Sequence, residues 1–297
     1  MKLITIGEIL WDVIGGQEHL GGALLNLSAH ATRLGHEVSL VSAVGEDQRG
    51  DRALEAMSSL GLSIDQIQRS DEWPTGIVTV TVAGDGQPKF EIHRPAAYDS
   101  MKFDTAALER LAALNPDWIC YGTLLSVYPR GRNLLFETMN AIPRARRFYD
   151  VNLRPKSFTS ELVLELLGRA TVVKLNQDEV RSLDLMFQGS TRTLEEFCRD
   201  HAARFGWQAV CVTRGELGCA VLVRDQYVEV PGYRVHVADT VGAGDAFAAA
   251  FLHGLNAGWP PAQIGDFANR LGALVASRRG GAARWSLDQI QALSRSG

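Results

Sequence analysis

The sequence predicts an α/β fold built on a mainly parallel sheet with helices on both faces. Short apolar runs of strand length alternate along the chain with segments of helical periodicity, which is the pattern of repeated βα units. Most of these runs are apolar throughout, as expected of parallel strands covered on both faces. Polar or glycine-rich residues follow several of the runs. Since the carboxyl ends of parallel strands share one edge of the sheet, ligand chemistry is expected there.

The first elements follow this alternation closely. Residues 3–7 predict a buried strand, and residues 21–34 follow with leucine and alanine at helical spacing. Gly35 ends that helix. A strand over 37–44 and a helix over 49–60 come next.

The segment from residue 76 to residue 93 departs from the alternation. Residues 76–82 alternate apolar and polar side chains with period two, turn through Gly84–Gly86, and return over 89–93. This pattern predicts a hairpin with one polar face. We expect it to project from the main sheet as a lid or a subunit contact.

The second half of the chain resumes the βα pattern. The expected strands and helices are, in order, strand 118–121, helix 134–139, strand 147–151, helix 162–167, strands 171–175 and 209–213, a hairpin of 219–223 with 227–230, and helices 243–256 and 264–277.

Composition and charge exclude several classes of protein. The chain has 297 residues, 46% of them hydrophobic and 22% charged, as in ordinary globular proteins. Its formal net charge of −4 argues against a broad nucleic-acid surface. The apolar run at 3–7 is too short for a signal peptide, and no apolar run reaches membrane-spanning length. The four cysteines lack CxxC spacing and are expected in the core of a cytoplasmic protein.

The stretch Asp239–Phe247 joins a glycine-rich turn to a helix start. Gly242 and Gly244 let the backbone approach a ligand closely, and the first amides of the helix favour an anion. Asp245 adds a carboxylate beside this anion hole. A phosphate does not need that charge for binding, so the pair indicates a base and a charge-stabilising hole that face one reacting centre. The alternative is that Asp245 only complements the helix dipole.

Polar residues recur where the other strands end. They are Asp12 after the first strand, Gly22 with Asn26 at the first helix, Asp150 with Asn152 and Arg154, Asn176 with Glu179, and the turn from Thr213 through Gly215 to Gly218. Each has an ordinary alternative as a turn residue, a helix cap or a surface ion pair. Their recurrence at one edge of the sheet favours a site.

Several enzyme classes are excluded because their motifs are missing. The sequence contains no GxxxxGK[ST], GxGxxG, HExxH or GxSxG. These absences argue against a P-loop NTPase, a dehydrogenase with the usual dinucleotide fingerprint, a zincin and a nucleophile-elbow hydrolase.

Two long signatures resemble those of the ribokinase-like (PfkB) carbohydrate kinases. The segment Gly21–Ser28, with Gly35 and Gly45 after it, is similar to the N-terminal signature, and Asp239–Asp245 is similar to the C-terminal one. The resemblance implies a single kinase domain over residues 1–297 with a three-layer α/β/α fold. It also implies a small β lid formed mainly by residues 76–93, with 13–20 as a further part, and a homodimer paired through such lids.

The resemblance implies roles for the candidate residues. Asp245 would be the base that takes the proton of the sugar hydroxyl, with the amides of Gly242, Ala243 and Gly244 as the anion hole. Asn176 and Glu179 resemble an NxxE element that helps to hold Mg²⁺ through water. ATP would bind at Thr213, Gly215, Gly218, Asn176 and Asn269, and sugar at Asp12, Gly22 and Asn26. Some relatives also hold a monovalent cation such as K⁺, here near Asp239 and Val241.

The substrate is expected to be a small sugar, and no nucleic acid or membrane is expected as a partner. The segments 7–12 and 150–155 resemble the fructokinase and 2-keto-3-deoxygluconate kinase branch, which favours fructose. Asn152, Arg154 and Arg94 are further candidates for sugar binding. Leu24 and 156–158 depart from the family pattern. The alternatives are a 2-keto-3-deoxygluconate kinase and a catalytically silent sugar- or nucleotide-binding regulator, although a binder would not need Asp245 beside the glycine turn.

Overall fold

The three-layer α/β fold expected from the sequence is present in the computed structural model, which describes residues 1–82, 88–154, 157–187 and 193–294. The expected turn at Gly84–Gly86, and Lys156, lie outside these residues. Nine strands belong to a large, mainly parallel sheet, and four belong to a smaller sheet. Contacts divide the chain into two units, one over 2–119 and 125–145 and the other over 120–124 and 146–297 with Met1.

The first unit, called here the N-terminal unit, contributes both to the large sheet and to the small one. Its strands in the large sheet are β1 (Lys2–Ile6), β4 (Glu37–Gly45) and β5 (Ile67–Ser70), which pair in parallel in that order. Its helices are α1 (Ala23–Arg33), α2 (Gln48–Ser59), α3 (Thr105–Ala113) and α4 (Pro129–Ala141).

The small sheet has the order β3-β2-β6-β7, with bounds Gln17–Gly21, Leu10–Ile14, Gly76–Val82 and Pro88–His93. The hairpin expected at 76–93 therefore exists, and its first strand pairs in parallel with β2. The segment 13–20 belongs to the same sheet through β2 and β3. That this sheet closes over a site as a lid stays a prediction.

The second unit, the C-terminal unit, contains the sheet order β13-β12-β11-β10-β9-β8. The bounds are Gln226–Val230, Cys219–Val223, Ala209–Thr213, Val172–Asn176, Arg146–Asp150 and Trp118–Gly122, the last strand beginning in the other unit. Strands β9, β10 and β11 are parallel, whereas β12 and β13 return antiparallel, as the second hairpin predicted.

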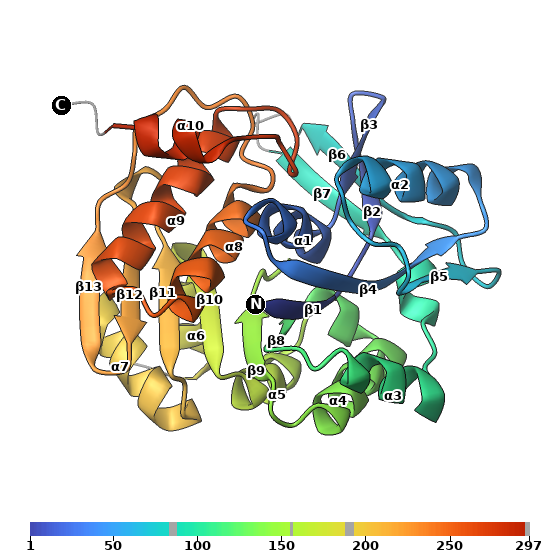
Figure 1. Cartoon of the computed structure of the whole chain (residues 1–297), viewed down its shortest axis with the longest axis horizontal. Helices are drawn as coiled ribbons and strands as arrows, with labels where there is room; N and C mark the ends of the chain where they lie inside the picture. The colour runs from blue at the N-terminus through green and yellow to red at the C-terminus, as the bar shows by residue number, and fades with distance from the viewer. Residues whose placement is uncertain (83–87, 155–156, 188–192, 295–297) are drawn as a thin grey trace. The chain divides into compact units, whose positions relative to one another are not determined.

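Among the described residues of the C-terminal unit, six helices are present. They are α5 (Ser160–Arg169), α6 (Gln177–Met186), α7 (Leu194–Phe205), α8 (Ala243–Asn256), α9 (Pro261–Ala276) and α10 (Leu287–Ala292). Helix α8 packs beside α9, which covers β12 and β13 on one face of the sheet, and α7 packs on the other face (Figure 1).

Several elements were not expected from the sequence. Strand β5 and helices α3, α6, α7 and α10 are short, and their mixed polar composition gives little periodicity. Four of these five are stabilised by details of their ends. Asp104 caps α3, and α6, α7 and α10 each begin with a reciprocal capping box.

The core confirms the expectation for the cysteines, since Cys120, Cys198, Cys211 and Cys219 are all buried and unbridged. Tyr121 and Tyr149 stack at 5.0 Å on neighbouring strands of the C-terminal unit. Among the residues described, no helix combines the length and the apolar character needed to cross a membrane.

Replacing Trp118 tests the packing of the strand layer. Trp118 is 0% exposed, so Trp118→Ala should lower the free energy of unfolding by about 3–5 kcal/mol through lost burial and a new cavity. The matched change Trp73→Ala, at a side chain 38% exposed, should lower it by less than about 1 kcal/mol. Urea denaturation followed by circular dichroism measures both, and equal losses would contradict this view of the core.

Candidate active site

The N-terminus of α8 is the centre of the candidate site. Its N-cap residue, Gly242, has a left-handed backbone with φ 76°, and as a glycine it has no side chain to cap this end. Asp245 lies in the first turn and is half-buried. The amide of Ala243 donates to the carbonyl of Thr240 at 3.3 Å, so an anion would rely chiefly on the amides of Gly242 and Gly244. A negatively charged group is favoured here because the helix dipole adds positive charge.

The turn before α8 is held by Asp239. Its Oδ1 accepts a hydrogen bond from the amide of Val241 at 3.0 Å, and its Oδ2 accepts one from the amide of Gly280 at 3.1 Å. A Cβ on Gly242 would collide with the backbone of Gly281. Glycine is therefore required at 242 both for its positive φ and for this close approach. A monovalent cation near Asp239 and Val241 stays a prediction.

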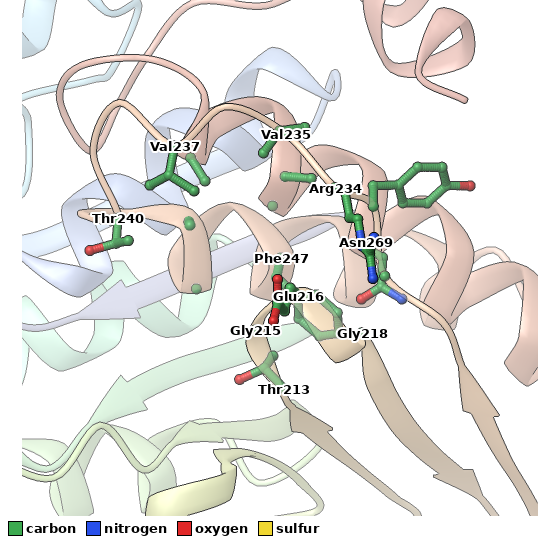
Figure 2. A pocket seen from close by; sticks show the side chains of 17 residues that line it. Thr213, Gly215, Glu216, Gly218, Arg234, Val235, Val237, Thr240, Phe247 and Asn269 are labelled. Carbon is green, nitrogen blue, oxygen red and sulfur yellow. The ribbon is translucent and has the colours of Figure 1, made fainter. Parts of the chain in front are cut away.

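A cavity of about 510 Å³ opens beside this turn, entirely within the C-terminal unit. Figure 2 shows Val235 and Val237 along one side and Thr213 on the other, with Phe247 projecting from α8. Its lining comprises Thr213, Gly215, Glu216, Gly218, Gly232–Val235, Val237, Thr240, Ala243, Gly244, Phe247, Asn269, Gly272, Ala273 and Ala276. This volume and a mostly apolar wall with few polar groups are typical of a small-molecule site.

The turn between β11 and β12 forms one wall of the cavity. Gly215 and Gly218 adopt φ of 58° and 94°, and a Cβ on Gly218 would collide with the carbonyl of Val230. Asn269, expected in the adenine pocket, does line the cavity, but its Nδ2 donates to the carbonyls of Val230 and Pro231 at 3.1 and 3.2 Å. Asn269 thus also holds the cavity wall in place.

Lys174 lies next to the start of α8. It was not among the site residues predicted from the sequence. It is in β10 opposite Asp150 of β9, and its Nζ lies 2.9 and 3.0 Å from the two carboxylate oxygens. A Cβ on Gly244 would lie 3.2 Å from this Nζ. Burial by itself would lower the pKa of Lys174, but the carboxylates of Asp150, Glu179 and Asp245 raise it well above its usual value. The ammonium therefore stays charged.

Asn176 and Glu179 form the reciprocal cap of α6. Asn176 Oδ1 accepts from the amides of Asp178 and Glu179, both at 2.9 Å. Glu179 Oε2 accepts from the amide of Asn176 at 2.7 Å, and Oε1 accepts from the amide of Leu153 at 2.9 Å. Burial raises the pKa of Glu179 despite the nearby ammonium of Lys174.

This arrangement fits a magnesium ion held through water. Each oxygen of Glu179 already accepts one backbone amide, which leaves a lone pair suited to a metal-bound water. Within the described ranges, no three His, Cys, Asp or Glu side chains form a metal cluster. Mg²⁺ usually keeps several waters and takes its remaining ligands from phosphates, so a dedicated cluster is not needed.

Asp12, Gly22 and Asn26 lie close together in the N-terminal unit. The carboxylate of Asp12 lies against the backbone of Gly21. Gly22, with φ 123°, begins α1, and its carbonyl accepts from the amide of Asn26 at 2.9 Å. Glu8 accepts from the amide of Ala23 at 2.9 Å and so satisfies the first turn of α1.

Arg94 lies in the same unit and makes a buried ion pair with Asp99. The side chains are 9% and 2% exposed, and Nε donates to Oδ2 at 3.1 Å while Nη2 donates to Oδ1. The guanidinium also lies 4.4 Å from the ring centre of Tyr128. Arg94 is a candidate for sugar binding from the sequence, and in the structure its charge is balanced by Asp99.

Asn152 and Arg154 follow β9 in the C-terminal unit. Asn152 is half-buried with a left-handed φ of 39°, which Asn tolerates better than most residues. Arg154 is exposed, and its charge acts on the carboxylate of Asp150.

The structure thus gathers the predicted residues into two groups. In the C-terminal unit, Thr213, Gly215, Gly218, Ala243, Gly244 and Asn269 line one cavity. Gly244, Asp245 and Glu179 are linked through Lys174. In the N-terminal unit, Asp12, Gly22 and Asn26 form a second group. The role of each residue stays a prediction. No role was predicted for Phe247, although it ends the stretch Asp239–Phe247, or for the loop 232–237, and Lys174 was signalled only by a lone charge in the apolar run Val172–Leu175.

A helix N-terminus beside a cavity, with a carboxylate in its first turn, is suited to phosphoryl transfer because it offers positive charge and a base next to a small-molecule site. Residues 7–287 match the pfkB family of carbohydrate kinases, and the chain belongs to that family. The enzyme class expected from the sequence, a carbohydrate kinase, is therefore confirmed.

Individual relatives agree with this assignment. A fructokinase of Escherichia coli is 29% identical over 94% of each chain. An uncharacterized sugar kinase of Pyrococcus horikoshii, solved in complex with ATP, is 26% identical over 94% of each chain with a TM-score of 0.80. A fructokinase of Xylella fastidiosa with bound ATP has a TM-score of 0.86 over 98% of this chain and 97% of its own, and at 23% identity it shows the shared fold.

The two glycines of the β11–β12 turn provide a matched test of the cavity wall. Gly218→Ala should lower the free energy of unfolding by more than about 2 kcal/mol, because it adds backbone strain and a collision with the Val230 carbonyl. Gly215→Ala meets no atom within 4 Å and should cost only the left-handed strain, about 1–2 kcal/mol. Urea denaturation of both variants checks the difference, and a larger loss at Gly215 would refute it.

Proposed function

We propose that this carbohydrate kinase transfers the γ-phosphoryl group of ATP to the primary hydroxyl of a ketohexose, most simply fructose. The observation that carries the proposal is the carboxylate of Asp245 in the first turn of α8, beside an N-terminus whose N-cap residue is the glycine Gly242. The turn would neutralise charge on the transferring group, and Asp245 would take the proton of the attacking hydroxyl. Because the transition state is loose, a carboxylate of ordinary basicity is sufficient and positioning supplies most of the rate.

ATP is proposed as the donor because the cavity beside α8 suits a nucleotide. Phe247 and Val235 give the cavity apolar lining, as a purine ring would require. Gly244 also lines the cavity and belongs to the turn at which the phosphates are proposed to bind. The ATP complex of the Pyrococcus horikoshii relative supports this choice. Mg²⁺, held by the phosphates and through water by Glu179, would neutralise phosphate charge.

A neutral sugar is favoured over a sugar acid by the pairing of Arg94. A carboxylate-bearing substrate would be expected to use a guanidinium fork. The fork of Arg94 instead binds Asp99, so its charge is already balanced. The name of the Escherichia coli relative, a fructokinase, points in the same direction.

The small sheet is proposed to act as a lid and as the contact of a homodimer. Its strands β3 and β7 are edges, and Ile14 in β2 is 39% exposed. Natural proteins seldom leave such edges unprotected, and pairing with a second copy would cover them.

Asp245→Asn tests the catalytic assignment. The amide keeps the shape but cannot accept the proton, so kcat should fall by roughly 10²–10⁴ with little change in sugar KM. Asp288→Asn is the matched control because Asp288 also lies in the first turn of a helix, α10, and is exposed. A coupled assay of ADP release measures both variants, and near-normal turnover by Asp245→Asn would remove the base from the mechanism.

The sugar is tested by comparing kcat/KM for fructose and 2-keto-3-deoxygluconate in the unmutated protein and in Arg154→Ala. With a neutral sugar, the loss of Arg154 should cost on the order of 0.5–1.5 kcal/mol, as for a neutral hydrogen bond. With a sugar acid it should cost about 1.5–3 kcal/mol and depend on salt. A tenfold preference for the acid would contradict the proposal, and nucleotide binding without turnover on any sugar would point to a regulator.

A further inference from the structure

Lys174 carries its positive charge in the protein core, where burying a charge costs free energy. Its side chain is 8% exposed, and the neighbouring residues of β10, Val172, Val173 and Leu175, are core residues. A buried ammonium is tolerated only when it is paired and hydrogen-bonded. Asp150, 3% exposed, meets that need with both of its oxygens, but a buried ion pair is a weak contributor to stability compared with apolar packing. The position of the pair therefore calls for a reason beyond stability.

The surroundings of Lys174 supply that reason. On one side its Nζ is held by Asp150, and on the other it lies 3.2 Å from where a Cβ of Gly244 would be. Gly244 is in the turn that begins α8 and lines the cavity. The carboxylates of Glu179 and Asp245 also act on the ammonium.

We propose that Lys174 is a positioning residue for the transferred phosphoryl group: Asp150 holds its ammonium against Gly244, where it adds a fixed positive charge behind the anion-binding turn of α8. The proposal rests on the proposed function in placing that group at the turn. The amides of the turn would orient the phosphoryl group by hydrogen bonds, and Lys174 would attract it by its charge. Because the Lys174 side chain is only 8% exposed, its charge is screened by water less than the same charge at the surface.

A positioning role and a purely structural role of Lys174 predict different nucleotide affinities. A nucleotide with a γ-phosphoryl group carries more negative charge next to the turn than ADP does. Removing the charge of Lys174 should therefore weaken the binding of a triphosphate more than that of ADP, and it should lower kcat. An ion pair that only joined β9 to β10 would change stability and would affect both nucleotides alike.

The experiment uses two variants that remove the charge in different ways. The double variant Lys174→Met with Asp150→Asn removes both charges, so that neither is left buried alone. Lys174→Gln keeps an amide that can donate to Asp150, and it provides the measurement if the double variant does not fold. Lys102→Met is the matched control, since the Lys102 side chain is 71% exposed and pairs with Glu72 in the N-terminal unit.

Dissociation constants for ADP and for the non-hydrolysable triphosphate AMP-PNP, each with Mg²⁺, are measured by titration calorimetry on the same sample. The ratio of the two constants is unaffected by a partly unfolded fraction. We expect ADP affinity within about threefold of the unmutated protein, AMP-PNP affinity weaker by about tenfold or more, and kcat lower on the order of 10²-fold. The control should leave all three unchanged.

An unchanged ratio in a folded charge-free variant would overturn the proposal and leave Lys174 a structural residue. Because calorimetry needs no sugar, this result is separate from the choice of fructose. A failure of the proposed function would appear instead as normal turnover by Asp245→Asn, or as a lack of AMP-PNP binding by the unmutated protein.

Discussion

The buried ion pair between Lys174 and Asp150 is the interaction on which the arrangement of the site depends. It joins β9 to β10 at the last pair of their parallel register, where Asp150 ends β9 and Lys174 lies two residues before the end of β10. Removing either partner would leave an uncompensated buried charge, at a cost of about 3–5 kcal/mol. The pair thus fixes the carboxyl ends of these two strands, and from those ends follow the cap of α6 at Asn176 and the loop that carries Asn152 and Arg154.

The helices differ in how their N-termini are capped. Helices α2, α3, α5, α6, α7 and α10 each begin with a side chain that accepts an amide hydrogen bond. Helices α4 and α9 begin with proline in the first turn and without a side-chain cap from the N-cap residue. Helices α1 and α8 begin at glycines with positive φ, Gly22 and Gly242, and both glycines belong to the family signatures. In α1 the carboxylate of Glu8 takes the first amide. The N-cap residue of α8 is a glycine without a side chain that could accept an amide hydrogen bond, so the stabilisation of an N-cap is given up at this position.

Local sequence was sufficient to predict the bounds of an element where its residues are apolar or small throughout. The predicted bounds of β11 and α8 agree with the structure because each has a continuous apolar or small-residue run between clear glycine or charged ends. Prediction failed for β5, α3, α6, α7 and α10, since a four-residue strand and short polar helices have little periodicity of their own. These helices depend on capping and on packing against the sheet, and both are set by distant residues.

The sequence by itself determined the α/β class, the family and the residues of the glycine turn with Asp245, because these depend on neighbours along the chain. The tertiary structure decided which charges meet. Lys174 forms an ion pair with Asp150, 24 residues earlier, and Arg94 forms one with Asp99. The amide of Asn269 also holds Val230 and Pro231, residues in a distant part of the chain. Charged and polar side chains have many partners available in a linear sequence, and only burial and strand register select one of them.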